Sequence, residues 1–178
     1  VPPGKVALQP GDLVNFLRGQ HGKELRDTVE PKHRWFRERT NALGDLVGSQ
    51  PIHVGTPIYS YLDRGYLDEE NAAGKTIPGF KTRMKSGTRA PTLYVGGNDG
   101  MLHAFDPQTL AEKWALVPSQ MVPKLVALAN PAYNMQHQFF IDGSPISGDV
   151  YDPNAAGVHA ERWRTILVGG YRAGGIGY

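Results

Sequence analysis

The sequence has no cysteine, no long apolar run and almost no net charge, and each absence excludes a class of protein. Without cysteine, these residues can form no disulfide and no thiolate metal site. No stretch approaches the roughly 18–20 apolar residues that a membrane-spanning helix needs. A net charge of +2 over 178 residues gives no strong overall attraction to nucleic acid or to an anionic membrane.

Motifs for catalysis are also missing. Gly143-Ser144-Pro145 is not a nucleophile elbow, because the proline would block the strand-to-helix turn that such a motif needs. The six histidines show neither H-x-x-x-H nor H-E-x-x-H spacing. His103 lies between apolar neighbours, which favours a hydrogen-bonded packing role over a role as a base or ligand. The sequence therefore assigns no catalytic residue and no cofactor-binding residue.

One group of acidic residues is a candidate for binding a metal ion. Asp142, Asp149 and Asp152 lie close together in the sequence, with Asn154 beside them. A calcium loop needs several oxygen ligands at close spacing, and this group does not match the pattern D-x-[DN]-x-[DN]-G. Turn formation by the short polar side chains is the favoured explanation of the group. We therefore assign no metal ligand and keep the three aspartates only as candidates.

What the sequence does contain is a succession of short strands and tight turns. Three strands are predicted over Leu93–Val95, Met101–Phe105 and Trp114–Val117, because their β-branched and aromatic residues suit a pleated surface. Asn98-Asp99-Gly100 predicts a hairpin turn, since asparagine and glycine tolerate positive φ. Asp106-Pro107-Gln108-Thr109 predicts the next turn. Three strands within ~25 residues are typical of one blade of a β-propeller.

A later region repeats this organisation in degenerate form. It is expected to hold strands at His137–Asp142, Gly148–Tyr151 and Arg162–Gly169, with a turn at Asp152–Gly157. Repetition of the same unit is a second sign of a propeller. A closed propeller of four to eight blades at ~40–50 residues each would normally be longer than this sequence. We therefore expect the first blades of a larger domain.

The segments around the predicted blades divide the sequence. Residues 1–40 are expected to form a lead-in, with a short helix over Gly11–Arg18 capped by Asp12 and then a polar loop. Residues 41–178 are expected to hold the blades of an incomplete propeller, starting with a bent strand over Leu43–Ser49 and Ile52–Val54.

Two further segments are expected to be insertions. Residues at about 59–90 read as an insertion with a helix near Asp68–Ala73 and an exposed basic loop over Lys81–Arg89. Ser119–Ala129 carries apolar residues at spacings of three and four, which is typical of a helix. The predicted fold is all-β: a partial propeller with short helical insertions.

Several ordered segments carry a resemblance to a known family. They are GDLVNFLRG from Gly11, LGDLVGSQP from Leu43, YVGGNDGMLHAFDPQT from Tyr94, EKWALVP from Glu112, FIDGSP from Phe140, WRTILVGG from Trp163 and AGGIGY from Ala173. Together they resemble the C-terminal quinoprotein-like β-propeller domain of PilY/PilC-type type IV pilus biogenesis factors. The resemblance covers the sequence from about Gly11 to Tyr178.

This resemblance implies a non-enzymatic factor that supports type IV pilus assembly, twitching motility and surface attachment. It implies minor pilins or other pilus tip proteins as partners, together with host or abiotic surfaces. It also implies export to the periplasm, the outer membrane or the pilus tip of a Gram-negative bacterium. Members of the family often carry a calcium-binding acidic loop in a later blade. That loop is not in this sequence, so we expect no cofactor in this part of the protein.

Two other functions remain as alternatives. PQQ-dependent dehydrogenases share the sequence pattern G-x-x-D-G-x-L-x-A-x-D, but they would need a cofactor pocket with a set of metal-binding carboxylates. A scaffold propeller of outer-membrane protein assembly is the other alternative, because one fold serves many functions.

Nucleic acid binding is a further possibility at the basic, aromatic run Pro31–Arg39. Glu30 and Glu38 interrupt the charge of this run, which favours a surface or packing role. We expect Trp35 and Phe36 to cover the rim of the propeller, and we predict no nucleic acid partner.

Overall fold

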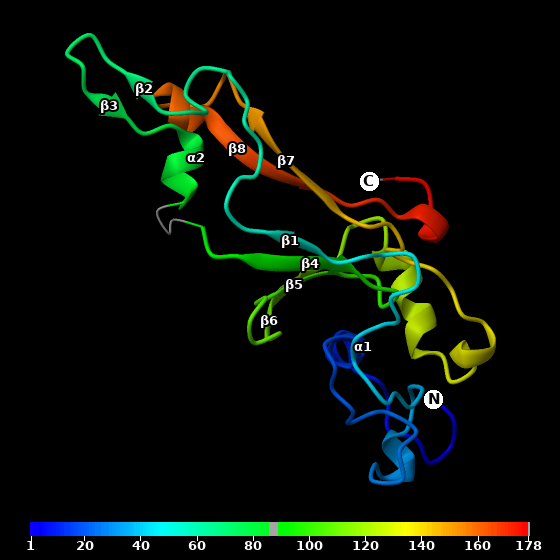
Figure 1. Cartoon of the computed structure of the whole chain (residues 1–178). Coiled ribbons are helices and arrows are strands. Elements are labelled where there is room, and N and C mark those ends of the chain that lie inside the picture. Colours follow the sequence, from blue (N-terminus) through cyan, green and yellow to red (C-terminus); the bar gives the residue numbers. More distant parts are fainter. Residues whose placement is uncertain (86–88, 178) are drawn as a thin grey trace.

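The computed structural model describes residues 1–85 and 89–177. Its strands form one four-stranded and two two-stranded antiparallel sheets, with short helices around them (Figure 1). The strands are β1 (Ile52–Val54), β2 (Glu69–Glu70), β3 (Thr76–Ile77), β4 (Thr92–Gly96), β5 (Leu102–Phe105), β6 (Glu112–Leu116), β7 (Ile146–Tyr151) and β8 (Trp163–Val168). The α-helices are α1 (Pro10–Leu17) and α2 (Phe80–Arg83), and the 3₁₀ helices are η1 (Pro31–His33), η3 (Val122–Ala129), η4 (Tyr133–Met135), η5 (His159–Arg162) and η6 (Arg172–Gly174).

The larger sheet has four antiparallel strands in the order β1-β4-β5-β6. The three strands predicted for the first blade are all present. Gly100 has a φ of +86° in the turn between β4 and β5, which explains the glycine at that position. Strand β1 joins the sheet beside β4, so a segment that precedes the insertion completes the blade.

Strands β7 and β8 form a second antiparallel sheet, with Ile146 opposite Val168 and Tyr151 opposite Trp163. In Figure 1 this hairpin lies alongside β1 and β4. Arg89 links the two sheets, because its guanidinium donates to the carbonyl of Gly55 after β1 and to the hydroxyl of Thr165 on β8. The two sheets are therefore arranged as neighbouring blades.

The prediction of a strand over His137–Asp142 is wrong. This segment is irregular, and its apolar residues Phe140 and Ile141 fill the main core instead of alternating across a sheet. The backbone N–H of Phe140 donates to the side-chain oxygen of Asn98, and that of Ile141 to the carbonyl of Gly97. The hydrogen bonds thus run to the β4–β5 turn, and no strand ladder forms.

The main core lies where the lead-in, η3 and the first sheet meet. Its buried members are Phe16, Phe36, Met121, Leu125, Leu128, Ala129, Tyr133, Phe140, Ile141 and Tyr171. The rings of Phe16 and Phe36 lie 5.0 Å apart. Phe36 is therefore a core residue and does not cover a rim as predicted, whereas Trp35 is partly buried against this cluster. The predicted helix over Ser119–Ala129 is present as the 3₁₀ helix η3.

Helix α1 confirms the helix predicted in the lead-in, but its N-terminus differs from the prediction. The residue before the helix is Gln9, and Pro10 starts it with a φ already suited to a helix. Asp12 is not the capping residue. Its carboxylate lies one turn inside and accepts the backbone N–H of Gln9 at 2.7 Å. A carboxylate in the first turn also interacts favourably with the helix dipole.

The prediction of a strand over Leu43–Ser49 is also wrong. The segment is held by isolated hydrogen bonds to turns of the blade. Gly44 N–H donates to the Asp99 carboxylate at 2.8 Å, and Gly48 N–H donates to Asp142 at 2.7 Å. The hydroxyl of Ser49 accepts the N–H of Gly96 at 3.0 Å. Only Ile52–Val54 forms a strand.

The insertion contains a small hairpin where a helix was predicted. Asn71 stabilises a turn, since its side-chain oxygen accepts the N–H groups of Ala73 and Lys75, and this turn joins β2 to β3. The predicted loop over Lys81–Arg89 begins inside α2, and its residues 86–88 lie outside the described part of the chain. Tyr66 and Phe80 of the insertion form a second hydrophobic core with Trp163 of β8.

Candidate binding pocket

The structure places the three aspartates proposed as metal candidates in separate hydrogen-bond networks. Asp142 accepts the N–H of Gly48. Asp149 is buried and accepts the hydroxyls of Tyr66 at 2.7 Å and Thr165 at 2.6 Å. Asp152 caps the turn that follows β7, through the N–H of Asn154. Within residues 1–85 and 89–177, no three acidic or histidine side chains are placed to hold a metal ion.

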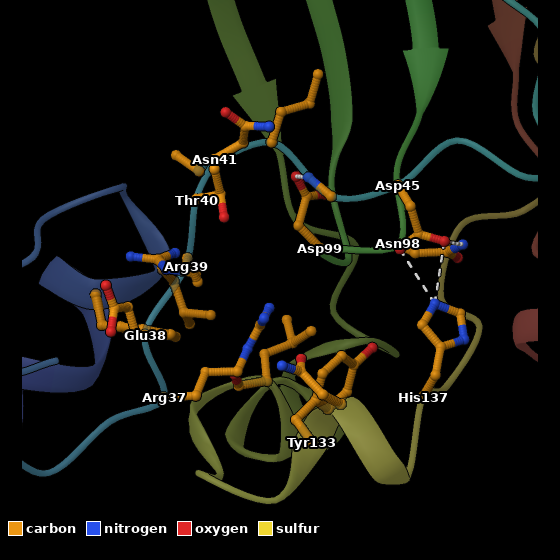
Figure 2. Close-up of a pocket in the computed structure, with 17 residues that line it drawn as sticks. Arg37, Glu38, Arg39, Thr40, Asn41, Asp45, Asn98, Asp99, Tyr133 and His137 are labelled. Atoms are coloured by element: carbon orange, nitrogen blue, oxygen red, sulfur yellow. Dashed lines mark hydrogen bonds and ion pairs between the residues drawn. The ribbon is translucent and has the colours of Figure 1, made fainter. Parts of the chain in front are cut away.

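A polar pocket of about 290 Å³ lies between the lead-in and the first blade. Its upper wall is the segment 40–45 with the β4–β5 turn, and its lower wall is η3 with η4 (Figure 2). The residues that line it and are labelled in Figure 2 are Arg37, Glu38, Arg39, Thr40, Asn41, Asp45, Asn98, Asp99, Tyr133 and His137.

The carboxylates of Asp45 and Asp99 are already engaged in this pocket. Asp45 lies 3.0 Å from Nε2 of His137, and it accepts the side-chain amide of Asn98 at 3.1 Å. Burial raises the pKa of Asp45, but the hydrogen bonds from His137 and Asn98 outweigh it, so that the pKa lies below its usual value. Asp99 accepts the N–H of Gly44 and lies 3.0 Å from Nε2 of His103.

Arg39 and Glu38 also have partners. The side chain of Arg39 is buried and pairs with the fully buried carboxylate of Glu24 at 2.8 Å. Its guanidinium lies 3.6 Å from the centre of the Phe16 ring. Glu38 lies 3.6 Å from Arg26. The buried Arg39–Glu24 pair stabilises the lead-in, whereas Glu38 is exposed and makes only this long contact with Arg26.

Arg37 differs from these residues. Its backbone N–H donates to the carbonyl of Ala129 at 3.0 Å, and its Nε donates to the carbonyl of Leu128 at 2.6 Å. Its guanidinium lies 4.7 Å from the centre of the Tyr133 ring, a cation–π distance. No acidic side chain of the described residues forms an ion pair with it. Burial, with the like charge of Arg39, lowers the pKa of Arg37.

The pocket is thus equipped for binding. Asp45 is paired with His137, and Asp99 is hydrogen-bonded to Gly44 and His103. Arg37 presents its terminal nitrogens to the space in the centre of Figure 2. Nothing in the order of residues distinguishes Arg37 from the other arginines of the run Pro31–Arg39. The signal lies in its contacts with Leu128 and Tyr133, which are remote in the sequence.

The fold and the sequence together define the class of the protein. A four-stranded antiparallel blade followed by a second hairpin at its side is the arrangement of successive blades in a β-propeller. Residues 43–178 match the sequence model of a family described as the PilY1 β-propeller domain. The chain belongs to this family.

Two curated relatives carry names that describe a function. The chain is 39% identical over 167 residues to the type IV pilus biogenesis factor PilY1 of Pseudomonas aeruginosa strain PAK, which covers 93% of the chain and 13% of that protein. It is 36% identical over 176 residues to a PilY1 homologue of Xylella fastidiosa strain Temecula1, which covers 98% of the chain and 13% of that protein. The chain therefore spans about an eighth of the length of these relatives.

No solved structure matches the chain. Among the helices of residues 1–85 and 89–177, none combines the length and the hydrophobicity that crossing a membrane requires.

Proposed function

We propose that the chain is part of the propeller domain of an exported type IV pilus biogenesis factor, and that it acts by binding rather than by catalysis. The observation that carries this proposal is the family match over residues 43–178, together with relatives that are named for pilus biogenesis. The pocket adds physical support, because its polar groups are arranged as hydrogen-bond partners and leave one arginine for a ligand.

The proposal includes partners and location. The partners are minor pilins or other pilus tip proteins, and host or abiotic surfaces. The protein acts outside the cytoplasm, in the periplasm, the outer membrane or at the pilus tip of a Gram-negative bacterium, where it supports pilus assembly, twitching motility and surface attachment. This part of the protein needs no cofactor, and any calcium would be held by residues outside it. A rigid propeller with inserted loops such as residues 59–90 suits this role, because recognition is concentrated in loops on a rigid scaffold.

Deletion of this domain in cells tests the proposal. In the deletion strain, the codons for residues 43–178 are removed from the chromosomal gene. In the complemented strain, a plasmid adds a copy of the intact gene. We expect few or no surface pili in the deletion strain, measured by shearing and electron microscopy, and recovery with the intact gene. Normal numbers of pili and normal twitching zones in the deletion strain, with no wild-type copy present, would contradict the proposal.

The dehydrogenase alternative has no supporting feature in the pocket. A PQQ-dependent dehydrogenase needs carboxylates that are free to hold a metal ion, whereas Asp45 and Asp99 are already hydrogen-bonded. Reduction of an artificial electron acceptor after addition of the quinone and Ca²⁺ to the purified protein would argue for that alternative.

A further inference from the structure

The polar pocket contains an arginine, Arg37, whose terminal nitrogens are free within the described part of the chain. The terminal nitrogens of Arg37 make no hydrogen bond to any residue in the described ranges. The side chains of Thr40, Asn41 and Asn134 line the same pocket, are exposed, and likewise have no hydrogen-bonded partner among the described residues. Asp45 already accepts hydrogen bonds from Asn98 and His137, and Asp99 from Gly44 and His103. A ligand that brings hydrogen-bond acceptors would complement the free terminal nitrogens of Arg37.

The charge and size of the pocket define the kind of acceptor. Arg37 presents a planar fork that matches the two oxygens of a carboxylate. The walls also carry the negative charges of Glu38, Asp45 and Asp99, so a doubly charged phosphate would meet stronger repulsion than a singly charged carboxylate. A volume of about 290 Å³ lies at the lower end of small-molecule pockets. It suits a single side chain or one sugar unit.

We propose that this pocket is a receptor for a carboxylate group, which binds to the guanidinium of Arg37 with the Tyr133 ring and the amide of Asn134 beside it. The carboxylate would belong either to an acidic side chain of a protein partner or to an acidic sugar of a surface. The inference deepens the proposed function, because it names a ligand chemistry for a protein that acts by binding. It is tested with purified protein, so its failure would leave the result of the deletion experiment standing.

The test uses the full-length protein that contains this chain, immobilised at physiological salt, and surface plasmon resonance with four polymers. Poly-L-glutamate represents the acidic side chain, polygalacturonate represents the acidic sugar, polyphosphate represents a phosphate, and dextran is the neutral control. Polymers are used because one carboxylate on one arginine binds weakly, and multivalency raises the apparent affinity. Since other parts of the protein can bind polyanions, the difference between variants is the quantity that decides.

Two variants probe the pocket in different ways. Arg37→Gln removes the guanidinium group, and we expect at least about tenfold weaker binding of a carboxylate polymer. Asn134→Asp places a negative charge on the wall while Arg37 keeps its contacts with Leu128 and Tyr133, and we expect a similar loss. Arg164→Gln is the matched control, because it removes an equal charge from an exposed arginine of β8, outside the pocket. It should bind as the unchanged protein does.

Each outcome decides the proposal. Loss with poly-L-glutamate alone identifies a protein partner, and loss with polygalacturonate alone identifies an acidic sugar. The proposal is overturned if both pocket variants bind the carboxylate polymers as the Arg164→Gln control does, or if polyphosphate depends on Arg37 as strongly as the carboxylates do. Should Arg37→Gln fail to fold, as circular dichroism would show, Asn134→Asp decides alone.

Discussion

Glu24 is the most completely buried acidic residue described in the chain, and it holds the lead-in together. Its carboxylate lies 2.8 Å from Arg39, 2.6 Å from Arg26 and 3.0 Å from His21. Burial raises its pKa, but the hydrogen bonds from Arg39, His21 and Arg26 outweigh that effect and lower the pKa to about 2. The stabilisation from this charge is therefore present above the usual pKa of 4.5 and is lost as the pH falls toward 2.

We predict that Glu24→Gln lowers the free energy of unfolding by about 3 kcal/mol at pH 7, since it leaves Arg39 buried without its charge partner. The variant should also lose less stability than the unchanged protein between pH 5 and pH 2, because the titrating group is gone. Urea unfolding at a series of pH values measures both effects.

Glu38→Gln is the control, because Glu38 is exposed and pairs with Arg26 only at 3.6 Å. Its effect should stay below ~1 kcal/mol. Equal losses in the two variants would show that the buried network is not the cause.

His103 joins the hairpin turn to the outer strand of the first blade. Its ring is buried, with Nε2 3.0 Å from Asp99 and Nδ1 2.6 Å from Glu112 on β6. Burial lowers the pKa of His103, but the hydrogen bonds and charges of Asp99 and Glu112 outweigh it, so the net effect is a raised pKa. The prediction of a hydrogen-bonded packing role for this residue is confirmed.

We predict a loss of stability as the pH rises through the pKa of His103. A histidine with a raised pKa in the folded state contributes stability that is complete below its unfolded pKa of 6.5, and that contribution disappears as the folded protein loses the proton. In His103→Gln the difference in unfolding free energy between pH 6 and pH 9 should be smaller than in the unchanged protein. Identical pH profiles of urea unfolding in both proteins would refute the prediction.

At the scale of elements, close backbone contacts hold the C-terminal segment to the core. Gly174, the last residue of η6, is buried, and a Cβ added there would overlap the carbonyl group of Phe140. Gly148, in the middle of β7, has no atom within 4 Å of the position its Cβ would take. Neither glycine has a positive φ, so an alanine at either position differs only in the space around it.

We predict that Gly174→Ala lowers the free energy of unfolding by about 1–3 kcal/mol, the usual cost of forcing atoms into a packed core. Gly148→Ala should be neutral or slightly stabilising, because alanine reduces the entropy of the unfolded chain. The midpoints of thermal unfolding of the two variants measure the difference. If the midpoints of both variants fall equally, the close approach of Gly174 to Phe140 is not what limits stability.

Elements whose hydrogen bonds are local could be predicted from the sequence. The strands β4, β5 and β6 alternate with turns that Gly100 and Asp106 specify within a few residues. The segment Leu43–Ser49 looks like a strand in the sequence, but its partners are side chains such as Asp99 and Asp142, far away in the chain. Local patterns carry no information about such distant partners.

The same reason limits what the sequence could say about the pocket. The run Pro31–Arg39 suggested a surface or packing role, and Phe36 and Arg39 are indeed buried. Among the described arginines of this run, Arg37 is the one whose terminal nitrogens have no hydrogen-bond partner. This depends on which cation lies near Glu24 and which near Tyr133. Those distances are set by tertiary packing of the lead-in against η3 and η4, which no spacing in the sequence encodes.

At the scale of the whole molecule, the first blade presents an open edge. Strand β6 is the last strand of its sheet within the described residues, and all five of its residues are exposed. Trp114 and Leu116 lie on one face of it, opposite Ala104 and Leu102 of β5, with exposed fractions of 44% and 53%. An apolar edge strand with free backbone groups favours pairing with another chain.

We predict that residues 1–178, expressed alone, self-associate through β6. Replacing Trp114 and Leu116 together by lysine should shift sedimentation velocity toward the monomer, because charges on an edge strand oppose strand pairing. The matched control replaces Val122 and Val126 by lysine, since both are more than half exposed but lie on η3, away from the sheet edge. A monomer at all concentrations in the unchanged protein, or an equal shift in both variants, would mean that β6 is not the associating edge.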